Sequence, residues 1–256
     1  VPTKYEGAIG IEFVLSNLWF LRSFLGTTTT TGSAPYIHTF SESNTAESFT
    51  IHNELDTDTN IVKQLLGCKV ASINISAAVG GLAMVRMDIL YGNEQSASTS
   101  AVVAETFDVY TFAHGSLELP NATTLAEVQN IELNLVQSPE GVWGLGSRTA
   151  QKMPVKTRDY SAKVTLAMEA QTNLLDKLIG GTGGPVLSPA ETATMELTFS
   201  NGLTGASTRS IVLLFTGVQL DEHSLPQDPT TVLLEDATLF MRTLSVTASD
   251  ATSAVQ

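Results

Sequence analysis

Apolar and polar residues alternate with a period of two along most of the chain. Near the start, Ile9, Ile11 and Phe13 share one face of an extended segment, while Glu12 takes the other face. Glycines in the middle of such stretches predict hairpin turns, at Gly80-Gly81 and at His114-Gly115. The pattern predicts further strands or hairpins in residues 69–90, 107–119, 127–136, 162–169, 193–199, 210–216, 231–234 and 237–246.

A few segments depart from this period. Short helices are predicted at residues 17–25, 60–66 and 172–179, each followed by a glycine that could end it. Low-complexity loops are predicted at residues 26–33, 94–100 and 180–185, in the long glycine-rich stretch 138–147, and in the tail 249–256. The fold class is therefore all-β with a few short helices.

The chain also repeats itself. The strand at Ala8 and the helix after it resemble a strand at Ala162 and its following helix, and Gly67 and Gly217 each open a later apolar stretch. The offsets between such partners drift from 148 to 156 residues, as loop insertions would produce. We expect a duplicated β-sandwich or barrel module: residues 1–92, a central part with hairpins and a long loop at 93–161, and residues 162–256, together forming one compact unit.

Composition narrows the function. The chain has 26 acidic against 13 basic residues, a formal charge of −13, which argues against binding nucleic acid through phosphate neutralisation. Acidity fits ordinary solubility, a salt-rich habitat or a surface that repels a polyanion. A single cysteine, Cys68, excludes an internal disulfide. The sequence contains no run of 18 consecutive apolar residues, so it predicts no membrane-spanning helix.

No constellation predicts catalysis, a cofactor or a metal. The glycine-rich stretches 141–146 and 180–184 lack the strand–turn–helix context of a phosphate loop. Asp56 and Asp58 resemble the opening of a calcium loop that lacks its glycine and final glutamate, so only a looser surface cation site remains open. The run Asp221-Glu222-His223 could belong to a catalytic group only with a nucleophile, but the Gly-x-Ser-x-Gly motif of a nucleophilic serine is absent. The protein is predicted not to be an enzyme.

Several phrases, taken in order, carry a resemblance to a known family; they are Ile9–Ser16, Leu18–Gly26, Tyr36–Phe40, Ser48–Ile51, Gly67–Ile75, Gly80–Leu82, Tyr110–Leu119 and Leu145–Arg148. Over residues 6 to 245 the chain resembles the tail tube proteins of long-tailed (siphovirus-like) viruses, in their tandem-repeat form. The acidic balance would fit a virus of a salt-loving archaeon.

The resemblance implies a structural virion protein. Such units close into hexameric rings by pairing strands edge to edge, and the rings stack into a hollow tail tube through which the genome passes into the host. The implied partners are further copies of the chain and the tail tip, tape-measure and tail terminator proteins. DNA would pass without specific binding, and no membrane or cofactor is implied.

Two sets of residues are expected to serve this role. Carboxylates on alternating strands are candidates for the lumen, although ordinary solvent-facing polarity would explain each singly; they are Glu12, Asp88, Glu132, Glu169, Glu196 and Glu235. The one basic concentration is a candidate contact between subunits or a solvated strand entry, with Arg148, Lys152, Lys156 and Arg158. The loops 26–35 and 137–155 and the C-terminal tail are candidate contacts between rings.

Three other classes remain open. An inner tube of a contractile or secretion apparatus would share the ring architecture and deliver a protein cargo. Another virion scaffold or decoration protein would form a discrete oligomer. A carbohydrate-binding sandwich would need clustered exposed aromatics, but the only tryptophans are Trp19 and Trp143.

Overall fold

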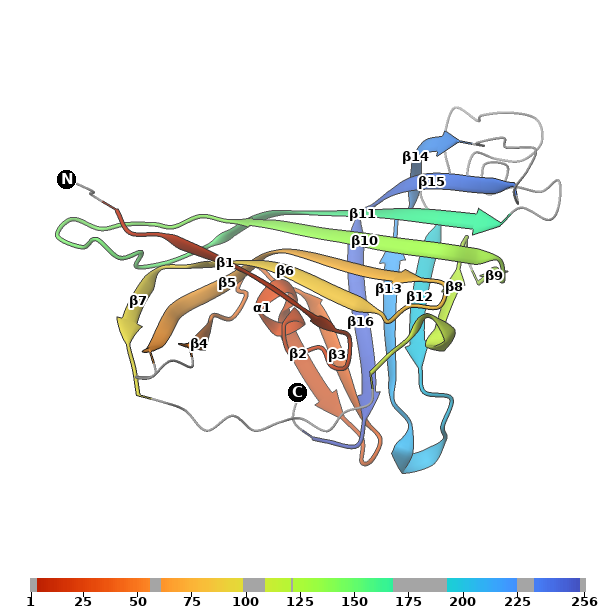
Figure 1. The fold of residues 1–256 in the computed structure, drawn as a ribbon, viewed down its shortest axis with the longest axis horizontal. Helices are drawn as coiled ribbons and strands as arrows, with labels where there is room; N and C mark the ends of the chain where they lie inside the picture. Colours follow the sequence, from red (N-terminus) through yellow and green to blue (C-terminus); the bar gives the residue numbers. More distant parts are fainter. Residues whose placement is uncertain are drawn as a thin grey trace.

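The computed structural model describes residues 4–55, 61–98, 109–120, 122–167, 193–224 and 233–253 as two antiparallel sheets packed face to face (Figure 1). The strands are β1 (Gly7–Val14), β2 (Gly26–Thr31), β3 (Tyr36–Glu42), β4 (Phe49–Leu55), β5 (Ile61–Ala78), β6 (Met84–Tyr91), β7 (Asn93–Ser96), β8 (Gly115–Glu118), β9 (Thr124–Leu125), β10 (Val128–Pro139), β11 (Val155–Ala167), β12 (Thr194–Ser200), β13 (Ser210–Thr216), β14 (Gln219–Ser224), β15 (Leu234–Met241) and β16 (Thr243–Asp250). The described helices are α1 (Leu21–Leu25) and the 3₁₀ turns η1 (Phe112–His114) and η2 (Gly205–Ser207). The all-β expectation is confirmed.

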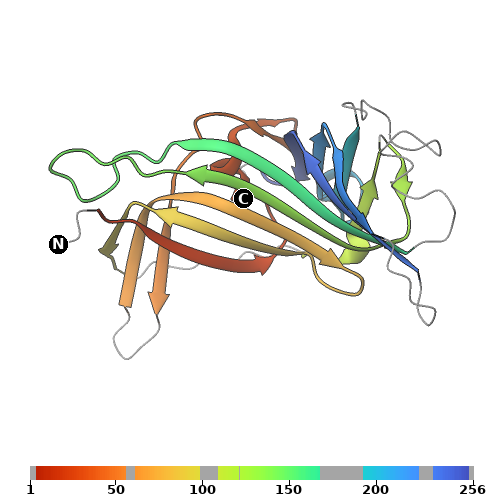
Figure 2. The same cartoon turned by 90° about the horizontal axis from the view of Figure 1, so that it is seen from above.

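The larger layer, here the long sheet, has nine strands in the order β1-β6-β5-β10-β11-β15-β14, with β4 and β7 paired to the first part of β5. The smaller layer, the short sheet, has seven strands in the order β2-β3-β16-β13-β12-β8-β9. In Figure 1 the strands of the short sheet run across those of the long sheet. Figure 2 shows from above that the long sheet is curved along its strands.

The core lies between the two layers and follows the predicted alternation. In β10, Ile131, Leu133 and Leu135 are buried, while the residues between them face outward. The rings of Tyr160 in β11 and Phe215 in β13 meet across the gap with centroids 6.2 Å apart. Burial of these alternate apolar faces is what holds the two sheets together.

Three expected elements prove different. Residues 61–66 are not a helix but the first part of β5, where strands on both sides supply the hydrogen bonds. The threonine run at 27–31 is not a loop but β2, paired with β3, as its β-branched residues favour. The expected hairpin around His114 is absent among residues 109–119, because Thr111 bridges Leu82 and β8 pairs with β12.

Other expectations are partly right. The helix expected at 17–25 is reduced to α1, and the disordered stretch expected at 94–100 begins as β7. The single strand expected at 237–246 is divided at Arg242 into β15 in the long sheet and β16 in the short sheet. The helix expected at 172–179 and the loop at 180–185 lie outside the described residues.

The repeat has a structural counterpart. The order β1-β6-β5 recurs as β11-β15-β14, and the trio β4-β5-β7 recurs as β12-β13-β16. Pairings agree at a constant spacing of 150 residues: Leu66 with Asn93 matches Thr216 with Thr243. Gly67 and Gly217, at the same spacing, both have positive φ (67° and 64°). The expected domain boundaries stay predictions.

The first strands of the two copies align differently from the sequence comparison. Ala8 pairs with Leu90, and the residue that pairs with the equivalent Phe240 is Ser161 rather than Ala162. Ala8 faces solvent whereas Ala162 is buried, so a match of Ala8 with Ala162 would place one strand with its faces reversed.

Candidate assembly surfaces

The outer face of the long sheet carries polar and charged side chains on most of its strands, with Val136 and Phe240 as exposed apolar residues among them. Glu12, Asp88 and Glu132 all lie on it, on β1, β6 and β10. The Ser72 hydroxyl donates to Asp88 Oδ2 at 2.7 Å, and the Asn74 amide donates to Glu132 Oε1 at 2.7 Å. Three of the six candidate lumen carboxylates therefore share one continuous surface.

Alternation and register place further charges on this surface. The acidic residues exceed the basic ones there; the acids are Glu12, Asp88, Glu132, Asp159, Glu222 and Asp236, and the bases are Arg86 and Lys163. Because these residues alternate with the buried residues along each strand, their side chains meet solvent rather than the core. The surface carries a net negative charge on a rigid, curved support.

The other candidate carboxylates lie elsewhere. Glu196 lies on the outer face of the short sheet, on the opposite side of the sandwich. Glu235 departs from the expected solvent-facing position, because it points into the sandwich and is 2% exposed. Its Oε1 lies 2.8 Å from His223 Nε2. Glu169 lies outside the described residues.

The basic concentration forms the far part of the β10–β11 hairpin. Arg148, Lys152 and Lys156 are exposed there, at the left end of the molecule in Figure 1. Lys156 forms an ion pair with Glu140, which lowers the pKa of that carboxyl. These residues project from the sandwich, so they are placed where a second subunit could reach them.

Arg158 has a different role from its three neighbours. Its Nη2 donates to the carbonyls of Phe24 at 3.1 Å and Ser43 at 2.6 Å, and its Nε donates to Phe24 at 3.2 Å. It therefore satisfies carbonyls at the C-terminal end of α1 and ties that helix to β11. This residue is engaged within the chain, unlike the contact to another subunit that was expected.

Replacing Arg158 by alanine is expected to lower the free energy of unfolding by about 1.5–3 kcal/mol, because charge-assisted hydrogen bonds to buried carbonyls are lost. The exposed Arg148→Ala is the matched control and should change it by no more than about 0.5 kcal/mol. Urea denaturation followed by circular dichroism measures both. Equal, small effects would show that Arg158 does not fasten α1.

The long sheet has two open edges, formed by its outermost strands β1 and β14. Among the described residues, β1 pairs only with β6 and β14 only with β15. The equivalent edges inside the chain, those of β11 and β5, are both covered by β10. An edge strand with unpaired backbone groups is a template for another strand, so both edges are places where copies of the chain can join.

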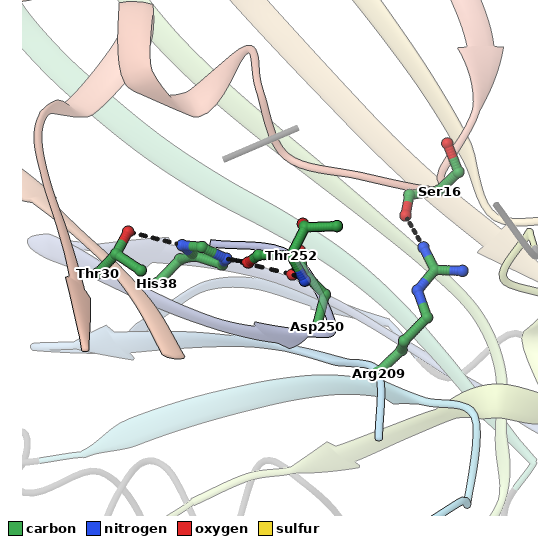
Figure 3. Close-up of polar contacts among 6 residues, drawn as sticks. All are labelled: Ser16, Thr30, His38, Arg209, Asp250 and Thr252. Carbon is green, nitrogen blue, oxygen red and sulfur yellow. Dashed lines mark hydrogen bonds and ion pairs between the residues drawn. The ribbon is translucent and has the colours of Figure 1, made fainter. Parts of the chain in front are cut away.

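The buried polar groups are structural. His38 is 1% exposed, and its Nδ1 lies 2.8 Å from Thr30 Oγ1. Its Nε2 lies 3.3 Å from Asp250 Oδ1 and 3.2 Å from the Thr252 carbonyl, so this nitrogen carries the hydrogen (Figure 3). The cluster fastens the last described strand to β2 and β3.

A second polar contact lies beside this cluster. Arg209 donates to the Ser16 carbonyl at 2.7 Å, joining the start of β13 to the segment after β1 (Figure 3). The hollow between them has a volume of about 20 Å³, too small for a substrate. Burial raises the pKa of the Cys68 thiol, so it is not activated as a nucleophile.

Across the described ranges no three His, Cys, Asp or Glu side chains are grouped to hold a metal ion. The helices in that part of the chain are too short to cross a membrane. The surfaces that stand out are therefore the acidic curved face, the open edges and the projecting hairpin. Leu145 at the hairpin tip lies in the loop 137–155 that is expected to contact another ring, but nothing in the sequence singled it out beyond its two flanking glycines, which signal a turn.

Comparison with known proteins gives one finding. A family model described as "Phage tail tube protein" matches residues 1–248, nearly the whole chain. No curated protein sequence matches it.

Proposed function

Because the chain belongs to the phage tail tube protein family, we propose that it polymerises as stacked rings into a hollow tube through which the viral genome passes into the host. The family makes it a structural component of the virion tail and implies self-assembly together with other tail proteins. The observation that carries the proposal is the long sheet, which is curved, polar and acidic outside, and open at both edges.

In the proposed ring, the open edge at β14 of one copy meets the edge at β1 of the next. Sheets joined in this way form a barrel wall, and the outer face of each long sheet lines the channel. Glu12, Asp88 and Glu132 would then face the DNA. Carboxylates repel phosphates, so DNA would slide past without being bound.

The ring of six chains stays a prediction. Because the chain contains a repeat, a ring of three chains is a second candidate. Each chain carries two equivalent sets of strands, so three chains would present six modules around the axis. Six chains would present twelve. Native mass measurement of isolated rings, combined with the symmetry of end-on images, distinguishes the two arrangements.

Electron microscopy of the purified protein over a range of protein and salt concentrations tests the proposal. We expect rings and hollow tubes, and a requirement for high salt would support the archaeal host. Tubes of Asp88→Lys/Glu132→Lys should retain DNA on sedimentation, whereas wild-type tubes should not. Discrete oligomers that never stack would favour the decoration-protein alternative. Tubes that enclose a protein cargo would favour the inner tube of a contractile or secretion apparatus.

A further inference from the structure

We propose that Leu145, at the tip of the β10–β11 hairpin of one copy, inserts into an apolar pocket at the opposite end of the long sheet of a second copy, and that this contact joins successive rings. The inference rests on the proposed function and specifies its partner surfaces. The β10–β11 hairpin projects at the left of Figure 1, whereas β8, β9 and the start of β10, which supply lining residues of the pocket, lie at the right.

The hairpin tip is a built projection. Leu145 is fully exposed, with a relative exposure of 107%. It sits in a turn closed by the Ser147 N–H, which donates to the Gly144 carbonyl at 3.2 Å, and Gly146 supplies the positive φ of 82° that such a turn requires. A leucine held at this turn buries no apolar surface within its own chain, so it contributes little to the stability of that chain.

Neighbouring contacts hold this tip in place. Val142 and Lys152 bridge across the hairpin, with the Val142 N–H donating to the Lys152 carbonyl at 2.8 Å. The N-terminal segment supports it too, since the Tyr5 N–H donates to the Arg148 carbonyl at 2.8 Å. Lys4 Nζ lies 4.4 Å from the Trp143 ring centroid. A preorganised tip loses little entropy on docking.

The pocket lies at the end of the sandwich where β10 starts and β5 ends. It has a volume of about 80 Å³ and opens between the start of β10, the end of β5 and the strands β8, β9 and β12. Its walls are mostly apolar, with Phe112, Leu117, Leu125, Val128, Ile131 and Phe199. Its size and chemistry suit the branched end of one leucine side chain.

The two features are placed for head-to-tail contact. β10 starts at Val128 in the pocket wall and ends at Pro139, where the projecting part of the hairpin begins. A contact between a tip and the opposite end of another copy leaves a free tip and a free pocket behind. Such a heterologous contact propagates into an open filament, as stacking of rings requires.

Charge supports the same pairing. At the hairpin tip Arg148 and Lys152 are exposed, and residues 141–154 contain no acidic residue. Beside the pocket the charge is acidic, since residues 112–133 contain no lysine or arginine and Glu127 adjoins the residues that line the pocket. Glu127 lies between the pocket residues Ala126 and Val128. A basic tip therefore approaches an acidic pocket rim, which favours this partner over a like end.

The first experiment compares Leu145→Asp with Leu203→Asp, a substitution of another exposed leucine (56%) in the loop after β12. Leu145→Asp should raise the protein concentration needed for tubes about 10–100-fold while rings still form, because one buried leucine per contact is lost. Leu203→Asp should leave tube formation unchanged. Sedimentation and electron microscopy measure both; unaffected tubes in Leu145→Asp would overturn the inference.

A cross-link tests the pocket directly. Mixing Leu145→Cys with Ala126→Cys under mild oxidation should give a disulfide-linked dimer, and the double variant should give a ladder of longer chains on denaturing gels. Cys68 is buried and should not contribute. If the wild type forms tubes but the cysteine variants do not cross-link, the docking contact is rejected and the tube function is unaffected. Absence of wild-type tubes would instead count against the tube function itself.

Discussion

Replacing Phe215 by alanine should lower the free energy of unfolding by about 3–5 kcal/mol, the largest effect expected of a single substitution here. Phe215 on β13 is 0% exposed and contacts Tyr160 on β11, so it joins the short sheet to the long sheet. Alanine would leave a cavity at the point where the two layers meet, and neighbouring strands could close it only partly. Guanidinium denaturation of the wild type and the variant measures the difference.

Phe240→Ala is the matched control for this substitution. Phe240 lies on β15 with half of its surface exposed (51%), on the outer face of the long sheet. Its loss should cost about half as much or less, because only about half of the side chain leaves water on folding and its removal opens no cavity between the sheets. Equal effects at the two positions would contradict a core located between the sheets.

The alternation of side chains made most of the fold predictable. A strand that buries one face must repeat every second residue, and Ile131, Leu133 and Leu135 show this pattern in sequence and in structure. It also identified Glu132 as solvent-facing. Alternation does not name the sheet to which a strand belongs. Its phase does shift inside residues 237–246, from the buried Leu239 and Met241 to the buried Leu244 and Val246, and this shift falls at Arg242, where the chain changes sheet.

Strand pairing decided the elements that were predicted wrongly. Residues 61–66 have a composition that suits a helix or a strand, and only the neighbouring strands β4 and β7 make the strand favourable. The threonine run has the composition of a low-complexity loop, yet threonine is a good strand residue when a partner such as β3 is available. Local propensity could not include these distant partners.

The candidate surfaces were predictable to the same extent. Alternation identifies carboxylates that avoid the core, but it does not say which side of the sandwich they face, so Glu196 was grouped with residues of the opposite face. It also failed for Glu235, where the polar residue occupies a core position beside His223. Arg158 was grouped by sequence proximity, whereas its carbonyl partners come from segments more than 100 residues away.

The repeat explains why Glu235 is unusual. At the constant spacing of 150 residues, His223 and Glu235 correspond to Ile73 and Val85, which are 1% and 0% exposed in the first copy. The same position in the sheet is thus apolar in one copy and a His–Glu pair in the other. Beside Ile73 the sheet continues into β10, whereas His223 lies on the edge strand β14.

This correspondence supplies the second large prediction. His223→Ile alone should lower the free energy of unfolding by about 1.5–3 kcal/mol, because a buried carboxylate loses its charge-assisted hydrogen bond. His223→Ile/Glu235→Val, which copies the first module, should return the stability to within about 1 kcal/mol of the wild type or above it, since well-packed apolar residues often replace a buried ion pair without loss.

A double-mutant cycle measured by urea denaturation tests this expectation. Ile73→His in the first copy is the control: it places an imidazole against the apolar Val85 and should destabilise without rescue. Recovery in the double variant would show that the two copies remain interchangeable in packing at this position. Additive losses in the double variant would mean that the second copy has repacked around the pair, so that the shared strand register no longer carries a shared core.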